Sequence, residues 1–494
     1  MLFNSIEFLF FIQIVFFLYW FVVKEKKIQN LFIVIISYIF YGWWDWRFLF
    51  LIAITSLCSF TLGVLNDKYY DKNKLKLLFC SLNIIINLSI LGTFKYFNFF
   101  AENLNLLFNS FGINLDLVAL NIILPVGVSF YTFQALSYTI DVYRGKIKAT
   151  KDIIEFFAYI CFFPQLVAGP IERATNLLPQ FQKKRTFDYN KAVDGCRQIL
   201  WGFFKKMVIA DNCAVAVNKI FETAAGGQPL DLSGFTYLVG GILFTFQIYC
   251  DFSGYSDIAI GCARLFGFDL MRNFKYPYFS RSIPEFWRRW HISLTTWFRD
   301  YIYFPLGGSK CDKWKTIRNV YIVWAVSGLW HGANWTFVLW GMYHGTLLAI
   351  YNILGIKKFI KDVAETSFFP SIKEILQISL TFFLVVIGWI IFRAENLTMA
   401  ANIFNQIFSL DNFWRASSVA ELNGLNLVKL AFFICILLIT EWIHRSEQHG
   451  LQVLTNSKLS VRNNLFFRYS IYILLAIITI GFAGNQSEFI YFQF

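Results

Sequence analysis

The chain has 494 residues, of which 57% are hydrophobic, 20% aromatic and only 15% charged. Ordinary soluble domains carry more charge, so the composition excludes a water-soluble globular protein and predicts an all-α, polytopic membrane protein. The net charge of +13 is accounted for by basic cytoplasmic loops, and nucleic acid is not an expected partner because no soluble basic domain is present.

Apolar stretches long enough to cross a bilayer recur along the whole sequence. They lie near residues 7–23, 29–44, 47–65, 77–94, 117–140, 335–354, 374–393, 427–443 and 468–484. These stretches are continuous rather than alternating, which predicts helices and not the strands of a membrane barrel. Together with less regular segments they suggest about 11–12 transmembrane or re-entrant helices in a single membrane domain over residues 1–494.

The segment Ile153–Arg173 ends in the sequence FFPQLVAGPIER, where Pro164 and Pro170 bracket a glycine. Two structures fit this pattern equally well. One is a proline-kinked helix, and the other is a re-entrant segment whose broken backbone lies inside the protein.

The next polar cluster, Asp251–Asp257, reads DFSGYSD and follows an apolar run. Its glycine suggests a turn, and Asp251, Ser253 and Tyr255 are more polar than packing needs, so they are candidate substrate-binding residues. Arg264 lies two helical turns after Asp257 and is its expected ion-pair partner. A helix cap with a structural ion pair is an equally good interpretation.

The segment Ser282–Gly308 predicts a helix that begins after Ser282, with Pro284 and Glu285 in its first turn. Phe286, Trp290, Leu294 and Trp297 form one apolar stripe, while Arg288, Arg289 and His291 lie off it. The pattern is typical of a basic amphipathic helix at the cytoplasmic surface. Such a helix anchors a protein to anionic lipid, or it lines an entrance for a phosphorylated donor.

His331 lies in the run Val320–Trp340, which contains no Asp, Glu, Lys or Arg. A buried imidazole stays neutral, and a neutral imidazole is a suitable general base near neutral pH. The alternative is a core histidine satisfied by one hydrogen bond. Trp330 and Asn334 flank it, and Asn334 is placed to orient the ring or to bind substrate. His344 is thirteen residues away and no HxxxH pattern occurs, so we expect no metal site.

Taken in order, these segments resemble the membrane-bound O-acyltransferase superfamily, and within it the bacterial branch of the alginate O-acetyltransferase type. The resemblance spans nearly the whole chain. It rests on residues 123–145, 162–174, 246–261, 273–308, 327–345, 388–400 and 489–494.

The resemblance implies a ring of helices around a tunnel, with residues 117–345 as the catalytic core segment. It implies that His331 is catalytic, that His291 is functionally important, and that the protein binds no cofactor. The expected activity is transfer of an acetyl group, with acetyl-CoA as the donor, across the bacterial inner membrane to a cell-surface polysaccharide such as alginate or peptidoglycan.

A periplasmic SGNH-type transferase is the expected protein partner, beside membrane lipid and the polysaccharide acceptor. On this interpretation Arg288 and Arg289 bind the donor phosphates, while Trp330 and Asn334 shape the site. Acyl transfer to a polymer resembling teichoic acid, and a non-catalytic transporter or flippase of acyl groups, are the alternatives. An acyl-enzyme on Cys250 is a weaker possibility, since nothing near it indicates a lowered thiol pKa.

Overall fold

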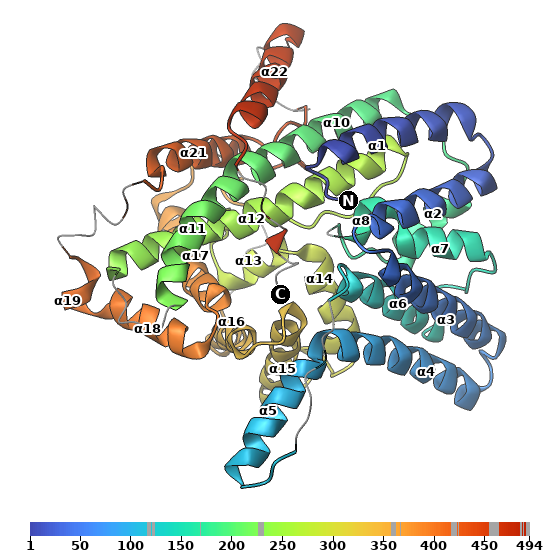
Figure 1. Cartoon of the computed structure of the whole chain (residues 1–494), viewed down its shortest axis with the longest axis horizontal. Helices are drawn as coiled ribbons and strands as arrows, with labels where there is room; N and C mark the ends of the chain where they lie inside the picture. The colour runs from blue at the N-terminus through green and yellow to red at the C-terminus, as the bar shows by residue number, and fades with distance from the viewer. Residues whose placement is uncertain are drawn as a thin grey trace. The chain divides into compact units, whose positions relative to one another are not determined.

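The structure is a computed structural model of the chain, and the regular secondary structure of the residues it describes is all helical (Figure 1). It describes residues 1–115, 120, 124–167, 169–225, 232–356, 362–365, 367–415, 422, 424–453, 464–484, 487 and 489–490. Contacts divide the chain into two compact units, each built from two stretches. Unit 1 contains Met1–Cys196 and Ala259–Met271, and unit 2 contains Arg197–Ile258 and Arg272–Phe494.

Unit 1 is built from the first part of the chain. Its helices are α1 (Ile6–Phe17), α2 (Lys26–Gly42), α3 (Leu49–Lys68), α4 (Asn73–Leu91), α5 (Phe97–Ser110), α6 (Val128–Tyr143), α7 (Ile153–Cys161), α8 (Phe163–Leu166), α9 (Ala174–Gln182) and the start of α10 (Tyr189–Phe203). The short segments η1 (Leu18–Val22), η2 (Trp46–Phe48) and η3 (Gly92–Tyr96) extend α1, α3 and α4.

Unit 2 carries all the candidate site residues. Its helices are α11 (Asp211–Ala225), α12 (Gly234–Leu265, up to residue 258), α13 (Ile283–Arg289), α14 (Ile292–Phe298), α15 (Lys313–His331), α16 (Trp335–Ile353), α17 (Ile372–Arg393), α18 (Leu397–Phe408), α19 (Leu410–Phe413), α21 (Leu427–Ile443) and α22 (Leu465–Gly481). The short segments are η4 (Phe204–Ala210), η5 (Pro277–Phe279) and η6 (Arg299–Tyr303).

Four helical segments among the described residues are long and apolar enough to cross a membrane. They are Trp46–Lys68, Asn73–Ser110, Gly234–Leu265 and Ile372–Arg393, and the shorter apolar segments Ile6–Val22 and Leu465–Gly481 add to them. The all-helical, polytopic architecture predicted from composition is therefore confirmed. The total number of crossings and the single-domain description stay predictions.

The segment Ile153–Arg173 is not one kinked helix. Helix α7 ends at Cys161, and the short helix α8 follows it. Phe162, between the two, has the non-helical angles φ −49° and ψ 106° and is fully buried. The interruption thus lies inside the protein, which is the condition under which broken backbone is tolerated at membrane depth.

Glycines allow two pairs of helices in unit 2 to approach closely. A Cβ at Gly341 of α16 would lie 2.2 Å from the backbone oxygen of Trp324 in α15. A Cβ at Gly202 would likewise lie 2.7 Å from the backbone oxygen of Gly254 in α12. Since real Cβ atoms do not approach this closely, only glycine permits these crossings, as in many packed membrane helices.

Candidate active site

His331 is the last residue of α15 and stands at the turn of the tightly packed α15–α16 hairpin. The next residue, Gly332, leaves the helix in an extended conformation, and Asn334 caps the start of α16 by accepting from the backbone N–H of Thr336. The side chain of His331 is only 5% exposed. The apolar run in which His331 was found is therefore two helices, and the histidine occupies the turn between them.

Aromatic side chains from three helices surround the His331 ring. The centroids of Trp330, Trp340 and Phe392 lie 4.9, 4.9 and 5.3 Å from its centroid, each nearly perpendicular to it. Edge-to-face packing of this kind holds a ring in one orientation. The imidazole is thus fixed in an apolar surrounding, which matches the predicted burial.

His291 lies in the turn between α13 and α14, two helices too short to span a membrane. Its backbone has φ 41°, a left-handed conformation that few non-glycine residues adopt and that is often found at functional sites. The turn is held by Asn273, whose backbone oxygen accepts from Ile292 N–H at 2.8 Å and whose side-chain oxygen accepts from the Ser293 hydroxyl at 2.6 Å.

The His291 ring packs among aromatic rings as the His331 ring does. Its centroid lies 4.6 Å from Phe252 of α12 and 5.9 Å from Trp330. Burial lowers the pKa of His291 to about 3, so this ring is uncharged near neutral pH. Trp330 therefore touches both histidines, and the structure brings together three of the predicted site residues.

The prediction of one amphipathic helix on the surface was wrong. Ser282 does cap α13, with its hydroxyl accepting from Glu285 N–H. However, the helix stops at Arg289 and resumes at Ile292, so the predicted apolar stripe is divided by the left-handed turn at His291. Phe286 and Trp290 face the protein interior and not lipid.

The two arginines of this segment have different environments. Arg288 is exposed. Arg289 is 7% exposed and donates to Glu285 at 2.8 Å and to Asp362 at 2.9 Å. Arg281 binds the same Glu285 from the other side at 3.1 Å. The guanidinium of Arg289 thus belongs to an ion-pair cluster.

The Asp251–Asp257 segment is not a turn after a helix, because α12 continues through it without a break. The predicted ion pair is also absent: Arg264 binds Asp194 at 2.6 Å, and Asp257 binds Lys205 at 2.6 Å. Gly254 serves the close approach of Gly202 instead of a bend. The helical spacing predicted Arg264 as the partner of Asp257, but Lys205, which is distant in the sequence, binds Asp257 instead.

Asp251, Ser253 and Tyr255 belong to a buried network around the two lysines of η4. Lys206 binds Asp251 at 2.7 Å and Asp211 at 2.9 Å, and all three side chains are at least 96% buried. Lys205 donates to Ser253 at 3.0 Å. Tyr255 packs with Phe489 near the end of the chain, at 4.5 Å between centroids.

The same network binds two of the last described residues, Ser487 and Ile490. The backbone N–H of Ile490 donates to Asp251 at 2.7 Å, and Lys206 donates to the backbone oxygen of Ser487 at 3.1 Å. Phe489 also contacts Phe252, which touches His291. No role of Lys205 or Lys206 was predicted from the sequence. Two lysines inside an otherwise apolar helix were the available signal.

Asn334 makes no hydrogen bond to His331 in the part of the chain that the structure describes. Its oxygen caps α16, and its amide nitrogen donates to the backbone oxygen of Glu395 at 2.8 Å. His344, in contrast, lies behind the site: its ring is 5.2 Å from Trp340, and its Nδ1 accepts from Trp287 Nε1–H at 3.3 Å. Among the described residues, no three His, Cys, Asp or Glu side chains are grouped as metal ligands would be.

Two buried histidines that both contact the Trp330 indole, close to a buried ion-pair network, form the candidate site of this helical membrane protein. Residues 35–369 match the model of "MBOAT, membrane-bound O-acyltransferase family", and the chain belongs to this family. It is therefore an O-acyltransferase.

Relatives support the same assignment. The chain is 42% identical to a "Probable alginate O-acetylase AlgI" of Pseudomonas putida, over 87% of this chain and 85% of that protein. It is 31% identical to a "Peptidoglycan O-acetyltransferase" of Helicobacter pylori, over 100% of this chain and 98% of that protein. A "Teichoic acid D-alanyltransferase" of Bacillus subtilis is 29% identical over 56% of this chain and 70% of that protein. These relatives support acyl transfer in the modification of a polymer.

Proposed function

We propose that this chain moves an acetyl group from cytoplasmic acetyl-CoA across the bacterial inner membrane for O-acetylation of a cell-surface polysaccharide. The observation that carries the proposal is the placement of His331 at a hairpin apex, fixed by aromatic rings and joined to His291 through Trp330. The names of the relatives with the widest coverage, which refer to O-acetylation, support acetyl over other acyl groups.

In the proposed reaction a hydroxyl oxygen of the acceptor attacks the carbonyl carbon of the thioester. The carbon–sulfur bond breaks, and the hydroxyl proton passes to the neutral ring of His331. The imidazolium then returns that proton to the leaving thiolate, which departs as CoA. General-base assistance of this kind contributes about 10²–10⁴-fold to the rate.

His291 assists as a neutral ring that donates a hydrogen bond to the thioester carbonyl. Its uncharged state, caused by burial, suits a donor that must not compete with His331 for the proton. The left-handed turn fixes the direction in which this ring points.

The donor enters on the side of Arg288. A nucleotide phosphate is anionic and stays outside the apolar interior, so an exposed guanidinium suits its recognition. Arg289 acts through the ion-pair cluster with Glu285 and Asp362, which holds α13 beside the entrance. No bound cofactor is needed for this reaction.

The acceptor is a polysaccharide such as alginate or peptidoglycan, reached with the help of a periplasmic SGNH-type transferase. The proposal is tested by supplying labelled acetyl-CoA to the cytoplasmic face of inverted membrane vesicles that contain the chain. Label should appear in the polysaccharide or in the partner, on the lumenal side. Label that remains entirely in acetyl-CoA would contradict the proposal.

The alternative is D-alanyl transfer, favoured by the similarity to the teichoic acid enzyme. The same vesicles distinguish the two, because a D-alanyl thioester would then be consumed and acetyl-CoA would not. A flippase without catalysis predicts unmodified label inside the vesicles.

A further inference from the structure

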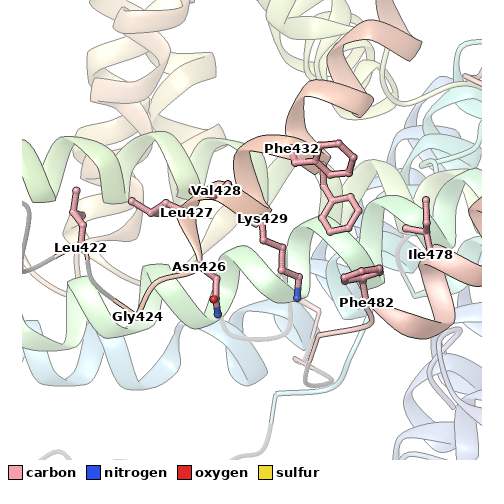
Figure 2. A pocket seen from close by; sticks show the side chains of 10 residues that line it. Leu422, Gly424, Asn426, Leu427, Val428, Lys429, Phe432, Ile478 and Phe482 are labelled. Atoms are coloured by element: carbon pink, nitrogen blue, oxygen red, sulfur yellow. The ribbon is translucent and has the colours of Figure 1, made fainter.

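Unit 2 contains an apolar groove that lies apart from the histidines and has no role in the proposed reaction. It is formed by the beginning of α21 and the end of α22, with a cavity volume of about 1080 Å³ (Figure 2). The lining residues are Leu422, Gly424, Asn426, Leu427, Val428, Lys429, Phe432, Phe433, Ile478 and Phe482.

The groove is open on one side. Val428, Phe432 and Phe482 are 87%, 60% and 44% exposed, so large apolar surfaces face outward. Helix α22 packs against η4 and leaves most of its apolar side chains uncovered. In a membrane protein such a face contacts the hydrocarbon of the bilayer, so we expect alkyl chains to occupy the groove.

Lys429 places a positive charge at one end of this apolar groove. Its ammonium donates to the Asn212 side-chain oxygen at 2.9 Å. It also lies 5.5 Å from the centroid of the Phe482 ring, and Figure 2 shows these two side chains next to each other. Asn212 is itself fixed, because its amide nitrogen donates to the backbone oxygens of Val208 and Phe482, each at 2.9 Å. These hydrogen bonds therefore fix the position of the Lys429 ammonium.

The charge on Lys429 is not neutralised within the part of unit 2 that the structure describes. The other half-buried or buried lysines there, Lys205, Lys206 and Lys275, each bind an aspartate within 2.9 Å. Lys429 has no carboxylate within ion-pair distance among the described residues. An ammonium has three donor hydrogens, and the bond to Asn212 uses one of them.

Lys429 also lies at the correct level for a headgroup. It is in the first turn of α21, and it faces the last turn of α22, so it stands where both apolar helices end. Lipid phosphates lie at the ends of membrane helices, and lysines near those ends bind them.

We propose that this groove binds one anionic phospholipid, with an acyl chain along Phe432 and Ile478 and the phosphate on Lys429. A transmembrane helix of a partner would fill the apolar part but would leave the ammonium without a counter-charge. The charge complementarity therefore favours the lipid. The bound lipid would fasten α22 to α21 and η4.

The test uses the full chain with a photoreactive phenylalanine analogue in place of Phe432, reconstituted in vesicles of phosphatidylglycerol and phosphatidylcholine in equal amounts. Mass spectrometry of the crosslinked protein identifies what lies in the groove. We expect phosphatidylglycerol adducts in about fivefold excess over phosphatidylcholine adducts, as one lysine contributes about 1 kcal/mol toward an anionic headgroup.

Lys429→Gln should abolish this excess, and Lys429→Arg should keep it. Lys219→Gln is the matched control, because Lys219 is exposed on α11 and its side chain has no partner among the described residues. Equal labelling by both lipids in the parent chain, or an excess that survives Lys429→Gln, would overturn the proposal. A crosslink to another protein when the same chain is irradiated in its native membrane would overturn it as well.

Discussion

The indole of Trp330 contacts the imidazole of His291, with 5.9 Å between ring centroids, although the two residues come from different helices. Because Trp330 directly precedes His331 and packs on its ring at 4.9 Å, this contact sets the distance between the two histidines.

Replacement of Trp330 should disturb the positions of the His291 and His331 rings. Trp330→Ala removes a side chain that is only 3% exposed, and such changes cost about 3–5 kcal/mol. We expect a lower melting temperature and a fall in kcat of tenfold or more, measured in the same detergent. Trp330→Phe keeps a ring in place and should retain most of the stability. Parental kcat in Trp330→Ala would show that the indole does not position the histidines.

The two adjacent arginines should respond differently to substitution. Arg288→Gln should raise the KM for acetyl-CoA with a smaller fall in melting temperature than Arg289→Gln, because Arg288 is exposed and Arg289 is buried. Arg289→Gln should lower the melting temperature, since it removes charged hydrogen bonds to Glu285 and Asp362, worth about 1.5–3 kcal/mol. Titration with acetyl-CoA and thermal unfolding of both variants separate the roles. If Arg288→Gln leaves KM unchanged, donor recognition lies elsewhere.

The buried network should be sensitive to loss of its central lysine. Lys206→Met leaves Asp251 and Asp211 without their shared counter-charge, and breaking a buried ion pair in this way costs about 3–5 kcal/mol. Thermal unfolding should show a large fall for Lys206→Met and almost none for Lys219→Met on the exposed face of α11. Equal melting temperatures would mean that the network adds nothing to stability.

Local signals in the sequence predicted local structure well. Ser282 caps α13 as expected, because its hydroxyl satisfies a backbone N–H group at the start of the helix. His331 is buried as expected, because the run around it carries no charged side chain. The ordered motifs predicted the membrane-bound O-acyltransferase family, which the family model confirms, since the set is specific even where each motif is short.

The errors all concern tertiary contacts. The glycine in DFSGYSD was interpreted as a turn, but its role is to admit the backbone at Gly202. Asp257 lies within reach of Arg264 along the helix, yet Lys205 from η4 is the partner it binds. The break at His291 could not be predicted from the local sequence, because few non-glycine residues adopt a left-handed conformation and Asn273, which stabilises the turn, lies outside the segment.

The most direct measurement of the central claim is the rate of acetyl-CoA-dependent transfer by purified, reconstituted His331→Ala, with its melting temperature measured in parallel. We predict a fall of about 10²–10⁴-fold in kcat while the protein remains folded. A folded His331→Ala variant that transfers acetyl at the parental rate would contradict the assignment of His331 as the general base.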